Sequence, residues 1–174
     1  MKHKGFTLVE LMVVIVIMGI LMAMGTIQFA GVVGRGRIKG AAEKISREIL
    51  GARERALSQG QAIDVVFSAS PNNNLVITIN RLTNPVVTTV LPTFTDCRVG
   101  VIASVNRRLP ETGVIVAVPP AIDFPANTCR FMPQGASTVG GIYITSNNGR
   151  YQFGIGVNAN GRVRKSEWGG TAWN

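Results

Sequence analysis

The sequence predicts an α+β protein in which one long N-terminal helix packs on an antiparallel β-sheet. The residues up to Gly60 have a helical pattern, an uncharged run followed by an amphipathic stripe. After residue 61, short β-branched runs alternate with turn residues, which is typical of strands. The chain has 174 residues, and the roughly 140 beyond the uncharged run suffice for one domain with a core but not for two.

The uncharged run covers residues 11–34, and about 20 apolar residues suffice for a helix to cross a bilayer. A cleaved secretory signal peptide is the alternative, but its small-residue cleavage site follows a shorter apolar region. Here the small residue, Gly5, precedes the run. We therefore expect residues 6–34 to form a retained transmembrane and assembly helix.

One acidic residue, Glu10, stands just inside this apolar segment. A carboxylate in a bilayer costs about 3 kcal/mol on insertion scales and usually marks a function or a partner. We expect its partner to lie on another chain. A single-pass anchor with a stray glutamate is the alternative.

Residues 5–11, Gly-Phe-Thr-Leu-Val-Glu-Leu, resemble the N-terminus of type IV pilins and of the pseudopilins of type II secretion. The resemblance implies that a prepilin peptidase removes residues 1–5 as a leader, cutting after Gly5, and methylates the new N-terminus, Phe6. It also implies that Glu10 pairs with the N-terminal amine of a neighbouring subunit during assembly.

A cytoplasmic N-terminus is favoured by the basic flank Lys2, His3 and Lys4. This preference for basic residues on the cytoplasmic side is weaker evidence here, because the other flank also carries positive charges: Arg35, Arg37 and Lys39.

The helix is expected to continue as an amphipathic extension over residues 35–60. Its apolar residues recur at steps of three and four. Glycines at the junction predict a kink or local melting, and Gly60 marks the helix end. The apolar stripe consists of Ile38, Ala41, Ala42, Ile45, Ile49, Ala52 and Leu57, and the junction glycines are Gly31, Gly34, Gly36 and Gly40.

Residues 61–174 are expected to form a β-rich periplasmic domain with a basic C-terminal tail. The turn 147–149, Asn-Asn-Gly, predicts a hairpin. The predicted strands are 63–67, 75–80, 86–91, 114–118, 141–145 and 151–157. This part resembles the GspH/FimT group of pilin-like proteins in residues 131–135, Phe-Met-Pro-Gln-Gly, in the strand 141–145 with its hairpin, and in residues 161–164, Gly-Arg-Val-Arg.

The cysteines are Cys97 and Cys129, an even number in a domain that should face an oxidising compartment. We expect a disulfide between them. Two buried thiols, which behave as small hydrophobic side chains, are the alternative.

The residues needed for catalysis are missing from the predicted mature chain. The one histidine, His3, lies in the leader, which excludes a Ser-His-Asp, Cys-His or His-rich metal site after processing. The sequence contains no phosphate-binding Gly-x-x-x-x-Gly-Lys-Ser/Thr loop. We expect neither enzymatic activity nor a metal or cofactor. The acidic residues of the domain do not form a cluster in the sequence, as shown by Asp64, Asp96, Glu111 and Asp123.

The excess of basic over acidic residues suggests a polyanionic partner. The chain has 18 Lys and Arg against 9 Asp and Glu, which gives a net charge of +9. Arg162 and Arg164 stand two apart on a predicted strand, so their side chains share one face about 6–7 Å apart. Lys165 is expected to extend the patch, and Trp168 and Trp173 to offer stacking faces.

This Gly-Arg-x-Arg element resembles the C-terminal motif by which FimT-type minor pilins bind DNA during uptake. Binding of double-stranded DNA would then be independent of sequence and strongly salt-dependent. Two alternatives stay open. In the first, the arginines are ordinary solvent-facing residues. In the second, an aromatic residue docks the C-terminal tail on the sheet instead of offering a stacking face.

The sequence thus predicts a minor pilin or pseudopilin of the bacterial inner membrane, assembled at or near the tip of a type IV pilus or a type II secretion pseudopilus. Its expected partners are other major and minor pilins or pseudopilins, the prepilin peptidase and inner-membrane lipid. Double-stranded DNA, the outer-membrane secretin or a secreted substrate are further candidates. DNA capture in natural transformation is the alternative function.

Overall fold

The structure is a computed structural model that describes residues 7–81, 87–91, 93–105, 108–112 and 120–174. It contains two compact units, Met1–Gly36 and Arg37–Asn174. Helix α1, Leu8–Gln59, contributes to both units. Each unit is described by itself.

The described part of the first unit is the start of α1. Its apolar side chains from Leu8 to Met22 are between 42% and 75% exposed, as are Val32 and Val33 at 72% and 49%. Among the residues that the structure describes, no helix has a stretch long and apolar enough to cross a membrane. The membrane crossing of residues 6–34 stays a prediction.

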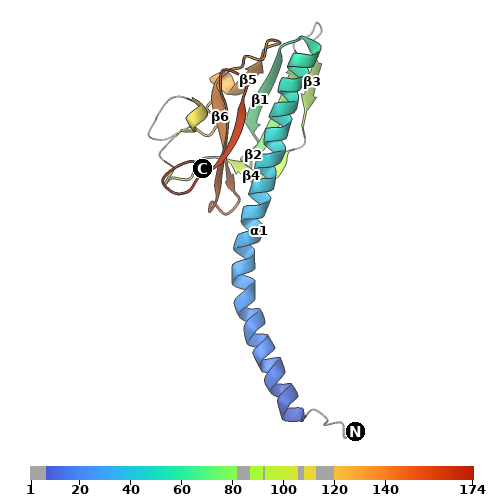
Figure 1. The fold of residues 1–174 in the computed structure, drawn as a ribbon, viewed down its shortest axis with the longest axis vertical. Coiled ribbons are helices and arrows are strands. Elements are labelled where there is room, and N and C mark those ends of the chain that lie inside the picture. The colour runs from blue at the N-terminus through green and yellow to red at the C-terminus, as the bar shows by residue number, and fades with distance from the viewer. Residues whose placement is uncertain (1–6, 82–86, 92, 106–107, 113–119) are drawn as a thin grey trace. The chain divides into compact units, whose positions relative to one another are not determined.

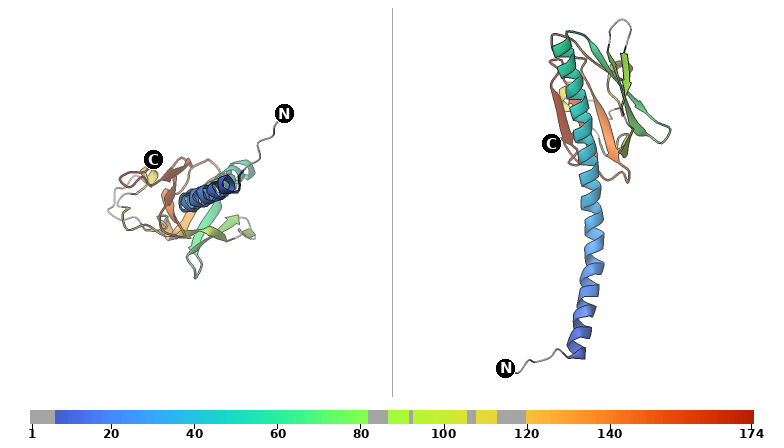
Figure 2. Two further views of the ribbon diagram at one scale, coloured as in Figure 1. Left: turned by 90° about the horizontal axis from the view of Figure 1, so that it is seen from below. Right: turned by 90° about the vertical axis from the view of Figure 1, so that its right-hand side faces the viewer.

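Helix α1 is unbroken through the junction glycines, so the predicted local melting is absent. In the second unit the helix lies along one face of the β-sheet (Figures 1 and 2). It buries one stripe of its side chains. The stripe was predicted correctly except at its end, where Leu57 is 44% exposed and Ala56 is buried instead. Ala56 continues the three-and-four spacing, whereas Leu57 lies about 100° further round the helix. The buried residues are Ile38, Ala41, Ala42, Ile45, Ile49, Ala52 and Ala56.

The sheet is antiparallel and has the strand order β5-β1-β2-β4-β6-β7-β8, with β3 paired to β2 beside β4. Within the described residues, the connections contain two short 3-10 helices, η1 (Pro110–Thr112) and η2 (Pro125–Asn127). The strands are β1 (Ile63–Ala69), β2 (Asn74–Arg81), β3 (Val87–Val90), β4 (Phe94–Val99), β5 (Thr128–Phe131), β6 (Gly140–Ser146), β7 (Gln152–Val157) and β8 (Val163–Glu167).

Strand alternation places the core between the sheet and α1. In β1 the residues Ile63, Val65 and Phe67 are buried in this core. The opposite face of the sheet, called the outer face below, carries Asp64 of β1 and Arg130 of β5. Their side chains form two hydrogen bonds of 2.6 and 2.7 Å.

The predicted strands 63–67, 75–80, 141–145 and 151–157 are confirmed, and so is the hairpin at 147–149. The described part of strand 86–91 is β3, whereas strand 114–118 lies outside the described residues. Strands β4 and β5 were missed. Both are short and interrupt their apolar residues with Thr, Asp or Arg, so neither gives a strong β signal.

Candidate functional site

The N-terminal motif is described from Thr7 onward, while Gly5 and Phe6 lie outside the described residues. The Glu10 carboxylate accepts hydrogen bonds from the Thr7 backbone N–H at 3.1 Å and from its hydroxyl at 2.9 Å. The Glu10 N–H donates to the Thr7 hydroxyl oxygen at 3.3 Å. This reciprocal pair is a capping box, which satisfies backbone donors at the start of α1. The Thr-x-x-Glu spacing carries this signal, but sequence reasoning considered only the charge of Glu10.

The three predicted DNA-binding residues lie at the C-terminal hairpin. Arg162 is exposed in the turn before β8, and its N–H donates to Asn158 Oδ1 at 2.9 Å. Arg164 is 54% exposed in β8, with its Nε 3.6 Å from Glu111 Oε1. The Lys165 ammonium donates to Glu43 of α1 at 3.1 Å.

These residues do not form one patch. Glu43 belongs to α1, so Lys165 points to the helix side of the sheet, and alternation places Arg164 on the outer face. The hydrogen bond from Lys165 lowers the pKa of Glu43. The prediction that Lys165 extends the patch is therefore wrong. DNA binding through Arg162 and Arg164 stays a prediction.

Glu111 approaches the outer face closely because Gly156 has no side chain. Gly156 is the β7 partner of Arg164, and a Cβ atom built there would lie 2.9 Å from the Glu111 Cβ. The Glu111 side chain is 8% exposed, and its Oε2 has no hydrogen-bond partner among the described residues. Arg164 is thus paired, although at a distance that makes the ion pair weak.

The tail aromatics pack on the outer face. Trp173 lies against Tyr143 with ring centroids 5.5 Å apart, and Trp168 against Trp173 at 5.2 Å. The Tyr143 hydroxyl oxygen accepts the Leu109 N–H at 2.9 Å, and burial raises the pKa of Tyr143 to about 12. The structure therefore has the docked tail of the alternative interpretation, with both tryptophans partly buried.

The predicted disulfide is wrong. Cys97 lies in β4 and Cys129 in β5, and no disulfide joins these buried thiols. Strands β1 and β2 stand between them, which at the usual strand spacing separates the Cα atoms by on the order of 14 Å. A disulfide requires Cα atoms within about 7 Å. Burial, and secondarily the charge of Asp64, raise the pKa of Cys129 to about 12, so its thiol is neutral and unreactive.

Two acidic residues of the domain, Asp64 and Asp123, form ion pairs with arginines. Asp64 pairs with Arg130, and Asp123 lies 3.0 Å from the Arg108 Nε. Burial raises the pKa of Asp123, against the opposing effect of Arg108. Among the described residues, no group of three or more His, Cys, Asp or Glu side chains could hold a metal ion.

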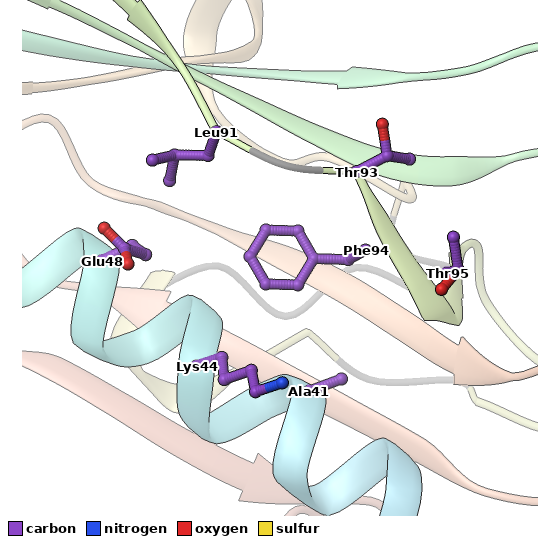
Figure 3. Close-up of a pocket in the computed structure, with 7 residues that line it drawn as sticks. All are labelled: Ala41, Lys44, Glu48, Leu91, Thr93, Phe94 and Thr95. Carbon is purple, nitrogen blue, oxygen red and sulfur yellow. The ribbon is translucent and has the colours of Figure 1, made fainter.

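A pocket of about 330 Å³ lies between α1 and the start of β4. The Phe94 ring projects from β4 into the space between Leu91 and the helix, where Lys44 and Glu48 line the other wall (Figure 3). Sequence reasoning missed this pocket because it missed β4.

The helix, the sheet and the N-terminal motif together define the class of this protein. Residues 1–26 match the prokaryotic N-terminal methylation motif. Residues 41–161 match the type II transport protein GspH. The chain therefore belongs to the GspH family.

The fold is similar to that of the minor pseudopilin EpsH from the type 2 secretion system of Vibrio cholerae. One EpsH structure has a TM-score of 0.51 and 17% sequence identity, covering 75% of this chain and 97% of EpsH. Another has a TM-score of 0.49 at 17% identity, covering 75% of this chain and 93% of that one. The first likeness confirms the predicted α+β, pilin-like fold. A search of the curated proteins finds no significant match.

Proposed function

We propose that this chain is a minor pseudopilin subunit, inserted in the bacterial inner membrane, processed after Gly5 and assembled with other pseudopilins into the pseudopilus of a type II secretion system. The observation that carries the proposal is the presence of two matches in one chain. The methylation motif of residues 1–26 is followed by the GspH match of residues 41–161. The EpsH neighbour, itself a minor pseudopilin, supports the minor class.

The exposed apolar side chains of residues 8–22 support the anchoring and assembly steps. An apolar surface of this extent needs lipid or other apolar helices around it, because its exposure to water is costly. Residues 6–34 would stay in the inner membrane before assembly and contact the equivalent segments of other subunits afterwards. We place the subunit at or near the filament tip, as a structural component rather than a catalyst, with its globular domain in the periplasm.

Deleting the gene in the bacterium that encodes it tests the proposal. We expect proteins exported by type II secretion to be lost from the culture medium and to accumulate in the periplasm, because the pseudopilus acts between these compartments. The wild-type gene on a plasmid should restore secretion. Natural transformation and pilus-dependent motility, measured in the same strains, should not change. Normal secretion together with lost transformation would contradict the proposal and favour DNA uptake.

A further inference from the structure

Arg98 lies on the outer face of the sheet, in a strand that has neighbours on both sides. Cys97 and Val99, before and after it in β4, are buried in the core beneath α1, so the Arg98 side chain points the other way and is exposed. Its cross-strand neighbours are Asn74 in β2 and Thr145 in β6. Both are neutral and can form hydrogen bonds.

Two arginines of the outer face, Arg130 and Arg98, differ in their partners. Arg130 has Asp64 directly opposite it, which accepts from two guanidinium nitrogens and raises the pKa of Arg130. No carboxylate among the described side chains lies within ion-pair distance of Arg98. A guanidinium presents its donors as a planar fork that matches the oxygens of an oxyanion. In Arg98 this fork has no anionic partner among the described side chains, which do not include that of Asp96.

The surface around Arg98 is hollowed into a pocket of about 510 Å³. The turn between β1 and β2 forms one wall with Asn72, Asn73 and Asn74, and the turn between β6 and β7 contributes Asn147. The backbone carbonyl of Asn73 accepts the Val99 N–H at 2.6 Å, and the side-chain Nδ2 of Asn147 donates to the Thr95 carbonyl at 3.2 Å. These bonds fix both turns to β4, so the walls are held beside the arginine.

We propose that this pocket binds a phosphate group, with the Arg98 guanidinium as the charged donor. Asparagine amides supply neutral N–H donors for further oxygens of a tetrahedral anion, and a phosphate has more acceptor oxygens than the fork alone can occupy. The phosphate can come from the free ion or from the ester end of a larger polar molecule. A single arginine in an open pocket implies weak binding.

The test is a titration of the full chain in a neutral detergent with inorganic phosphate and, separately, with glycerol phosphate. The Nε–H resonance of Arg98 is followed by nuclear magnetic resonance, with the ionic strength held constant with sodium chloride. We expect saturable shifts with a dissociation constant in the millimolar range, about 1–20 mM. Tighter binding of the ester would indicate that the pocket takes an esterified phosphate, and equal or tighter binding of inorganic phosphate would indicate the free ion.

Three variants make the test specific, with binding measured by calorimetry. Arg98→Ala should weaken binding about tenfold or more, because it removes charge-assisted hydrogen bonds. Arg98→Lys keeps the charge but loses the fork, and should fall between this variant and the wild type. The matched control is Arg150→Ala, an exposed arginine of the neighbouring turn that does not line the pocket. It should change the affinity less than about twofold, since screened charges act weakly. Shifts that do not saturate, or equal losses in Arg98→Ala and Arg150→Ala, would overturn the proposal.

Discussion

Replacing Gly161 with alanine is expected to lower the free energy of unfolding by about 2–4 kcal/mol. Gly161 has a φ of 72°, in the left-handed region that costs side-chain-bearing residues about 1 kcal/mol or more. A Cβ atom at this position would also lie 2.6 Å from the Gly135 carbonyl oxygen and 2.7 Å from the Arg53 Nε of α1. The backbone oxygen cannot move aside cheaply, so overpacking adds about 1–3 kcal/mol.

The matched control is Gly149→Ala in the β6–β7 turn. Gly149 has a similar φ of 67°, but a Cβ atom there would meet nothing within 4 Å. This variant should lose only the conformational part, about 1 kcal/mol. Urea unfolding of the full chain in detergent, followed by tryptophan fluorescence, measures both. Equal losses in the two variants would contradict the close packing of Gly161 against Gly135 and Arg53.

Replacing Glu10 with alanine is expected to abolish incorporation of the subunit into the pseudopilus. The resemblance to type IV pilins implies that the Glu10 carboxylate pairs with the N-terminal amine of a neighbouring subunit, and no other acidic residue lies before Glu43 to replace it. In the single chain the same carboxylate caps α1 through Thr7. A loss of assembly in Glu10→Ala alone therefore does not separate the ion pair from the cap.

Glu10→Gln separates the two roles, because glutamine can complete a capping box but carries no charge. If the ion pair drives assembly, Glu10→Gln should fail as Glu10→Ala does. The fraction of the chain that co-sediments with sheared filaments measures assembly. Glu54→Gln, at an exposed glutamate of α1 outside the motif, is the matched control and should assemble normally. Wild-type assembly of Glu10→Gln would assign Glu10 to helix capping alone.

Much of the fold follows from local patterns. The buried stripe of α1 and the strands around the 147–149 hairpin were predicted because their periodicity and turn residues act over a few neighbouring residues. The missed strands β4 and β5 are held in the sheet by pairing with strands that are distant in the sequence. Leu57 shows the same limit, since position on the helix rather than apolar character decides burial.

The two errors in the predicted site have different causes: the sequence does not reveal strand order, whereas strand alternation alone already places Lys165 on the face opposite to Arg164. An even cysteine count suggested a disulfide, but β1 and β2 separate Cys97 from Cys129. Neighbouring cations suggested one patch, but Lys165 and Arg164 point to opposite faces and pair with Glu43 and Glu111. The close approach of Gly161 to Gly135 and Arg53 is also a tertiary feature. It gives a packing reason for the glycines in residues 131–135 and 161–164.

The most direct test of the central proposal is the intact mass of the chain isolated from membranes of its own bacterium. Processing predicts a mass without residues 1–5 and with one added methyl group on Phe6. In a strain that lacks the prepilin peptidase, the leader should stay attached. A chain that keeps its leader in the peptidase-containing strain would contradict its assignment as a pseudopilin subunit.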